Sequence, residues 1–261
     1  MSYLMESAGE GQRLLAQERA NPSAVRLLQA GLSAGMKVAD LGCGSGAVMT
    51  SILALVGPEG SVTGLDPSLE RVEEARALMQ GAANVEVKQG SLPATGLPEQ
   101  AFDFTWSQFV FEYLREPATA LQEMIRLTKP GGTVAVADVD GIGLAFWPRP
   151  AVVEEGIEPF MRALTSTGFD FFVGRKLFTL FRQAGLKDVS VHLSSLYVSA
   201  GADARLLADY TQRFEVLAPI ASKTFGSEQK YWDFTQGYLS MLADPDALKY
   251  AVVLTVAGRR G

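Results

Sequence analysis

The residues with the clearest chemical potential lie in one short stretch, where Asp40 precedes glycines at positions 42, 44 and 46. Glycine lacks a Cβ, so a loop built from Gly42, Gly44 and Gly46 can turn tightly and approach a ligand closely. An apolar segment precedes the loop and a helical pattern follows it, which is the setting of a nucleotide-type cofactor site. Cys43 lies inside this loop, and we expect it to be a small packing residue rather than a nucleophile.

The charge of Asp40 separates the candidate ligands. With Ala47, the glycines also fit the fingerprint of dinucleotide-binding proteins. A carboxylate at the mouth of the loop repels a pyrophosphate, whereas it attracts a ligand that carries an ammonium and a sulfonium group, such as S-adenosylmethionine. An NAD(P)-dependent oxidoreductase remains the alternative, but the Tyr–Lys pair or histidine relay that it predicts does not stand out.

Composition restricts the partners. The 261 residues carry a net charge of −6 without a Lys/Arg cluster, which argues against nucleic acid and favours a small molecule. One cysteine and one histidine cannot build a zinc site of the usual type, so we expect no metal. No apolar run is long enough to span a bilayer, and no secretory signal is visible. We therefore expect a cytoplasmic protein, either a monomer or a homodimer.

Periodicity predicts an α/β protein. Strands are expected at 36–41, 61–65, 85–88, 102–107 and 133–139, and a Pro-Gly-Gly turn at 130–132 precedes the last of these. Two helices within 10–32, parted at Asn21 and Pro22, come first. Helices at 47–56, 68–80 and 118–128 separate the strands, an order that implies a parallel sheet with right-handed crossovers.

The second half alternates less regularly. The predicted elements there are helices at 152–165, 174–184, 203–217 and 228–242, and strands at 186–195 and 250–257. We expect one overall domain, in which 1–35 forms a helical cap over the cofactor and 36–139 the cofactor-binding core. The remainder, 140–261, completes the sheet and carries lid insertions at about 140–173 and 197–249.

Four segments match one family in order: the Asp40–Gly46 loop, Gly64–Ser68, Phe102–Ser107 and Glu123–Gly132. Over 36–139 the chain resembles class I S-adenosylmethionine-dependent methyltransferases, in the style of the ubiquinone/menaquinone-biosynthesis methylases. The resemblance implies a Rossmann-like sheet of seven strands, mostly parallel with an antiparallel last strand, with helical lid insertions. It also implies S-adenosyl-L-methionine as cofactor, S-adenosyl-L-homocysteine as product, and methyl transfer to O, N or C of a small molecule.

Several further residues are candidates for cofactor binding. Asp66 lies 24 residues after Gly42, where an acidic side chain can accept hydrogen bonds from both ribose hydroxyls. Where the family commonly has Gly-Asp after the third strand, this chain has Gly90 and Ser91, and Ser91 is the shorter, neutral acceptor expected for the adenine amine. The other candidates are Leu92 as a wall for the adenine ring, Pro67, Tyr3 and Gln17 of the entry segment, and Ser107 at the carboxyl end of the fourth strand with Gln108 and Phe109 next to it.

Candidates for chemistry follow the fourth and fifth strands. Where relatives often carry histidines, this chain has Glu112, a candidate base or orienting acceptor, and Tyr113, which can align a substrate oxygen. Asp138 is a second candidate proton acceptor at the sheet edge where such folds place substrates. The absence of those histidines, together with Ser91, keeps open a protein that binds the cofactor without transferring a methyl group.

Aromatic residues concentrate in the two insertions. They can form the apolar core of a lid or line a pocket for an aromatic or lipophilic acceptor. The candidates for contact with the acceptor are Phe146, Trp147 and Trp232.

Overall fold

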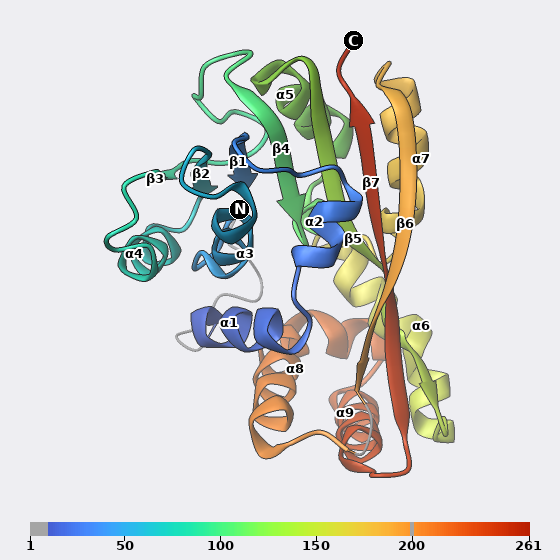
Figure 1. Cartoon of the computed structure of the whole chain (residues 1–261). Coiled ribbons are helices and arrows are strands. Elements are labelled where there is room, and N and C mark those ends of the chain that lie inside the picture. The colour runs from blue at the N-terminus through green and yellow to red at the C-terminus, as the bar shows by residue number, and fades with distance from the viewer. Residues whose placement is uncertain (1–9, 199–200) are drawn as a thin grey trace. The chain divides into compact units, whose positions relative to one another are not determined.

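The structure of the chain, a computed structural model, describes residues 10–198 and 201–261. In this part, seven strands form one sheet in the order β3-β2-β1-β4-β5-β7-β6 (Figure 1). The strands are β1 (Lys37–Leu41), β2 (Ser61–Asp66), β3 (Val85–Gln89), β4 (Phe102–Gln108), β5 (Thr128–Trp147), β6 (Lys187–Val198) and β7 (Leu248–Arg259).

The pairing of the strands confirms the predicted sheet. β1 pairs in parallel with β2 and β4, and the pairs β2–β3 and β4–β5 are also parallel. The N–H of Gly131 donates to the carbonyl of Arg260 at 2.8 Å, and the N–H of Arg260 donates to the carbonyl of Gly132 at 2.9 Å. Because this reciprocal pair joins the start of β5 to the end of β7, the two strands run antiparallel.

The helices alternate with the strands in the first half and dominate the second. They are α1 (Glu10–Ala20), α2 (Ala24–Gln29), α3 (Ala47–Val56), α4 (Leu69–Leu78), the 3₁₀ turn η1 (Phe111–Tyr113), α5 (Pro117–Leu127), α6 (Ala151–Ser166), α7 (Val173–Gln183), α8 (Ala204–Phe225) and α9 (Glu228–Ala243). None of these described helices is a candidate membrane span.

The described residues divide into two compact units. We call 10–138, 173–194 and 253–261 the sheet unit, and 139–172, 195–198 and 201–252 the helical unit. β5, β6 and β7 contribute residues to both.

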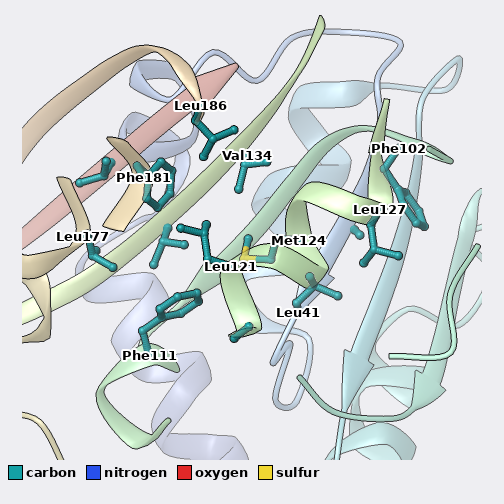
Figure 2. Packing of buried hydrophobic residues seen from close by; sticks show 14 of the residues in the cluster. Leu41, Phe102, Phe111, Leu121, Met124, Leu127, Val134, Leu177, Phe181 and Leu186 are labelled. Atoms are coloured by element: carbon teal, nitrogen blue, oxygen red, sulfur yellow. The ribbon is translucent and has the colours of Figure 1, made fainter. Parts of the chain in front are cut away.

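Helix α5 anchors the core of the sheet unit. Its buried residues Leu121, Met124 and Leu127 recur every three positions, so they lie on one face. They pack in one cluster with Val134 of β5 and Phe181 of α7 (Figure 2). This cluster fixes β4 and β5, whose carboxyl ends carry several of the candidate site residues.

The predicted bounds of two elements are wrong. β5 begins at Thr128 and continues to Trp147, although the sequence predicts a strand over 133–139 after a turn at 130–132. The glycines of that turn pair with Arg260, which is far away in the sequence, so their local turn propensity is overridden. Helix α8 continues through Pro219 to Phe225, beyond the predicted end at 217, because its stop is Gly226 in the left-handed conformation.

The helical unit has its own aromatic core. Phe234 of α9 is 1% exposed, and its ring lies 5.2 to 6.1 Å, centroid to centroid, from those of Phe160, Phe214 and Phe225. Trp232, two residues earlier on the same helix, is 37% exposed. Their positions on one helix make them a matched pair for a stability measurement.

We predict that Phe234→Ala lowers the free energy of unfolding by about 3–5 kcal/mol, because it leaves a cavity among packed rings. Trp232→Ala should change it by about 1 kcal/mol or less, since that side chain is partly exposed. Urea denaturation followed by circular dichroism measures both. Equal losses for the two variants would contradict this account of the core.

Candidate functional site

The loop between β1 and α3 has a backbone conformation that favours glycine. Gly42, Gly44 and Gly46 have φ values of 84°, 54° and 83°. The N–H groups of Gly42 and Cys43 both donate to the carbonyl of Leu65, at 2.7 and 3.0 Å. The loop is thereby fastened to the end of β2.

Neighbouring side chains lie close to the glycines of this loop. A Cβ at position 42 would lie 2.4 Å from Cγ2 of Val110, and one at position 44 would lie 2.8 Å from Cδ1 of Leu14. A Cβ at position 46 would lie 3.2 Å from that of Ala75. Packing therefore also disfavours a larger residue, most clearly at position 42.

Two carboxyl groups are buried beside the loop. Asp40 is 2% exposed and Asp66 is 9% exposed, and Oδ2 of Asp40 has no hydrogen-bond partner. Burial, with the charges of Asp66 and Glu18, raises the pKa of Asp40 to about 8. Burial also raises the pKa of the Cys43 thiol, which agrees with a packing role for that residue.

Asp66 links the loop to the next helix. Its Oδ2 accepts the N–H of Gly44 at 2.8 Å, and its Oδ1 accepts the N–H of Ser68 at 3.0 Å. Ser68 in turn caps α4, since its Oγ accepts the N–H of Arg71 at 3.4 Å. The glycine loop and the start of α4 therefore share one carboxylate.

The turn after β3 presents the residues expected near an adenine ring. The N–H of Gly90 donates to the backbone carbonyl of Asp66 at 3.0 Å, which places the turn at the end of β2. Ser91 is exposed, whereas Leu92 is partly buried and packs against the core of the sheet unit. Pro67 is exposed, and its carbonyl accepts Nε2 of Gln89 at 3.0 Å.

The end of β4 is fastened from two sides. Ser107 is fully buried, and its hydroxyl donates to the carbonyl of Leu41 at 2.8 Å, just before the glycine loop. Phe109 has a φ of 57°, which is rare for a bulky residue, and its N–H donates to the carbonyl of Ala137 at 3.0 Å. Strain of this kind concentrates at functional sites.

A polar network connects the N-terminal helices to this strand end. Oε1 of Gln108 accepts the hydroxyl of Ser23 at 3.1 Å and Nε of Arg26 at 3.3 Å. The carboxylate of Glu18 accepts that hydroxyl at 2.6 Å and the hydroxyl of Ser51 on α3 at 2.7 Å. Burial lowers the pKa of the Arg26 guanidinium, and the charge of Glu18 opposes that shift.

Asp138 holds the turn that carries the candidate base. Its Oδ2 accepts the N–H groups of Phe111 at 2.8 Å and of Glu112 at 3.3 Å. Both Asp138 and Glu112 are buried, and Tyr113 is partly buried. Through these two hydrogen bonds Asp138 fixes the position of η1.

Comparison with known proteins identifies one family. A family model described as "Methyltransferase domain" matches residues 39–136. Demethylmenaquinone methyltransferase of Geobacillus stearothermophilus is 30% identical over 180 residues, which cover 64% of this chain and 77% of that protein. Trans-aconitate 2-methyltransferase of Methylobacterium nodulans is 35% identical over 127 residues, covering 49% of this chain and 47% of that protein.

A solved structure agrees in fold. Geranyl diphosphate methyltransferase in complex with S-adenosylmethionine has a TM-score of 0.57 and 14% identity, and the match covers 98% of this chain and 92% of that one. The chain belongs to the class I S-adenosylmethionine-dependent methyltransferases. Two further curated relatives are longer than the part that this chain matches, because the match covers only 31% of one and 43% of the other.

The cofactor of this methyltransferase is S-adenosylmethionine, and the residues beside the loop suit it. Asp40 presents a buried oxygen without a partner, and Asp66 a largely buried carboxylate, while the ligand brings a sulfonium and an ammonium group. The glycine loop ends at the N-terminus of α3. These features lie entirely in the sheet unit.

The sheet unit brings together most of the predicted cofactor residues, but not all. The side-chain oxygen of Gln17 on α1 accepts a hydrogen bond from Nη1 of Arg13 at 2.7 Å. The charge of its neighbour Glu18, in contrast, contributes to the raised pKa of Asp40. Tyr3 lies outside the described residues. The sequence does not predict the network that Glu18, Ser23 and Arg26 form with Gln108. The nearest local signal is the helix start predicted at Asn21 and Pro22.

The three predicted pocket residues belong to the helical unit and differ in their surroundings. Phe146 is buried, with its ring 5.8 Å from that of Tyr238 in an edge-on arrangement, so it is part of the aromatic core. Trp147 is exposed, and Trp232 is partly exposed. Within the helical unit, they do not form one cluster with Phe146.

We predict that Asp40→Asn changes how stability depends on pH. Because the pKa of folded Asp40 is raised, its stabilising contribution is complete in acid and is lost as the pH rises through about 8. The variant has no such proton to lose. The melting temperature of the variant minus that of the wild type, both measured without cofactor, should therefore increase between about pH 5 and about pH 9.

The exposed Glu59→Gln is the control and should parallel the wild type at every pH. A difference between Asp40→Asn and the wild type that is constant over this range would contradict the assignment of a raised pKa to Asp40.

Proposed function

We propose that this methyltransferase transfers the methyl group of S-adenosylmethionine to an oxygen, nitrogen or carbon atom of a small molecule. The observation that carries the proposal is the pair of buried carboxyl groups, Asp40 and Asp66, beside a glycine loop. Asp66 is a carboxylate, and Asp40 can ionise when a cation faces it, so this site favours a cationic cofactor over a dinucleotide, whose pyrophosphate Asp66 repels.

Each end of the cofactor has candidate partners. Asp66 would accept the ribose hydroxyls, and the carboxyl group of Asp40 would face the ammonium and sulfonium charges. The turn at Gly90, Ser91 and Leu92 would border the adenine, as the sequence predicts. Ser107, Gln108 and Phe109 stand at the end of β4, where their backbone would approach the methionine part.

Little covalent chemistry is required of the protein. The bound cofactor supplies an electrophilic methyl group, and the chain has only to align an acceptor and exclude water. Glu112 would accept a proton or orient the acceptor, and Tyr113 would hold an acceptor oxygen by a hydrogen bond. Asp138 would act through the backbone of η1, where it fixes the position of Glu112.

The acceptor is proposed by class. The relatives named above act on demethylmenaquinone and on trans-aconitate, both small molecules. The aromatic residues of the helical unit support an acceptor with an aromatic or lipophilic part, with Trp147 and Trp232 as the exposed candidates for contact. With a net charge of −6, we propose no nucleic-acid partner.

Titration calorimetry of the full chain with S-adenosylmethionine, S-adenosylhomocysteine and NAD tests the cofactor assignment, and we expect only the first two to bind. Turnover is then measured as S-adenosylhomocysteine formed in the presence of hydroxyl, amine and carbon acceptors. Binding of NAD alone would contradict the proposal. Binding of S-adenosylmethionine without turnover on any acceptor class would support a binding protein that does not transfer methyl groups.

We predict that Asp66→Asn weakens S-adenosylmethionine binding about tenfold or more, in line with ~1.5–3 kcal/mol for hydrogen bonds to a charged group. An amide oxygen can still accept the N–H of Gly44, so the loop should keep its shape.

Asp103→Asn is the matched control, because Asp103 lies at the start of β4 and pairs with Lys129 at 2.6 Å. It should leave the affinity unchanged. An unchanged affinity in a folded Asp66→Asn variant would remove Asp66 from the site.

A further inference from the structure

A cluster of tyrosines and cations in the helical unit has no part in the site described above. Tyr210 and Arg213 lie on α8, Tyr238 lies on α9, and Lys249 lies in β7. Lys249 is 7% exposed, and its Nζ donates to the hydroxyl of Tyr210. The same Nζ lies 4.0 Å from the ring centroid of Tyr210 and 5.4 Å from that of Tyr238.

The charges of this cluster do not balance. Nη2 of Arg213 pairs with Oδ2 of Asp209 at 2.9 Å, so this carboxylate is already paired. Among the described residues, Lys249 makes no ion pair with a carboxylate. The Nε of Arg213 is also buried without a hydrogen-bond partner. The cluster therefore holds one excess positive charge and one unsatisfied N–H donor.

An ammonium group in such surroundings is costly unless an anion compensates it. Cation–π attraction to the two rings offsets only part of that cost. Burial raises the pKa of the Tyr210 hydroxyl, but the charges of Lys249 and Arg213 lower it below its ordinary value, against an opposing effect of Asp209. The potential at that hydroxyl is thus positive, as an anion site requires.

The cluster is also held in place. The hydroxyl of Tyr238 donates to the carbonyl of Gly143 at 3.2 Å, and its ring lies 5.5 Å from that of Phe214 and 5.9 Å from that of Phe234. The guanidinium of Arg213 lies 5.6 Å from the ring centroid of Tyr210. Groups that are fixed before a ligand arrives lose little entropy when it binds.

We propose that Lys249, Arg213 and Tyr210 bind the anionic group, a carboxylate or a phosphate, of a small-molecule ligand. Lys249 provides the charge, and Nε of Arg213 and the hydroxyl of Tyr210 provide donors. This site is proposed in addition to the function stated above. Anion binding itself does not depend on that function.

Titration calorimetry and thermal melting of the full chain, without cofactor, test the proposal. Inorganic phosphate and citrate are the two probes, and sodium chloride at equal ionic strength is the reference. We expect one or both probes to bind and to raise the melting temperature above that in chloride. A response to phosphate alone indicates a phosphate ester as the ligand, and a response to citrate alone indicates a carboxylate.

Lys249→Met keeps the apolar part of the side chain and removes its charge, and it should weaken the responding probe at least about tenfold. Because it also removes an unpaired charge, this variant should melt no lower than the wild type in chloride. Lys230→Met, on the exposed surface of α9, is the matched control and should bind as the wild type does.

Arg213→Lys retains the charge but loses the Nε donor, and it should weaken the same probe, whereas the exposed Arg205→Lys on α8 should not. A spectroscopic readout accompanies these variants, because a bound anion offsets Lys249 and should raise the pKa of Tyr210. The tyrosinate absorbance that Tyr210→Phe removes should therefore appear at higher pH when the probe is present.

The proposal is overturned if neither probe binds the wild type, or if Lys249→Met binds as well as the wild type. A lower melting temperature of Lys249→Met in chloride, with no response of the wild type to either probe, would assign Lys249 to a structural pair with Tyr210. If the probes bind but S-adenosylmethionine does not, the anion site stands and the proposed function fails.

Discussion

The burial of two neighbouring carboxyl groups at the ends of β1 and β2 is the electrostatic constraint on which the sheet unit depends. Asp40 keeps a proton up to about pH 8 because burial and the charges of Asp66 and Glu18 disfavour its ionised form. Asp66 remains compatible with burial because two backbone N–H groups donate to it. A positively charged ligand stabilises the ionised carboxyl groups, whereas the pyrophosphate of a dinucleotide is repelled by them.

The surrounding structure keeps these groups in place. The glycine loop bonds to Leu65 and Asp66, Ser107 ties the end of β4 to Leu41, and the network of Glu18, Ser23, Arg26 and Gln108 secures the N-terminal helices to the same strand end. Asp138 accepts two backbone N–H groups of η1 and so holds the turn that carries the candidate base. The candidate cofactor-binding and catalytic residues of the sheet unit are thus held in place by hydrogen bonds as well as by packing.

The sequence predicts what local signals encode. The spacing of the glycines, the acid at the end of β2 and the apolar periodicity of α5 are all visible within a few residues, and the structure confirms the elements that they indicate. The partners of Gln108 lie more than 80 residues away in the chain, and the pairing of Gly131 with Arg260 spans nearly half of it, so neither leaves a local pattern. The cluster around Lys249 was missed for the same reason, since Tyr210 is 39 residues away.

The most direct test of the central claim is the number of protons released when the cofactor binds. Calorimetric titration with S-adenosylmethionine at pH 7, repeated in buffers of different ionisation enthalpy, measures it. If the cofactor's positive charge faces Asp40, whose pKa is about 8 in the free protein, most of one proton should be released in the wild type and none in Asp40→Asn. Binding of the cofactor with no proton release in the wild type, or with equal release in both proteins, would contradict the account.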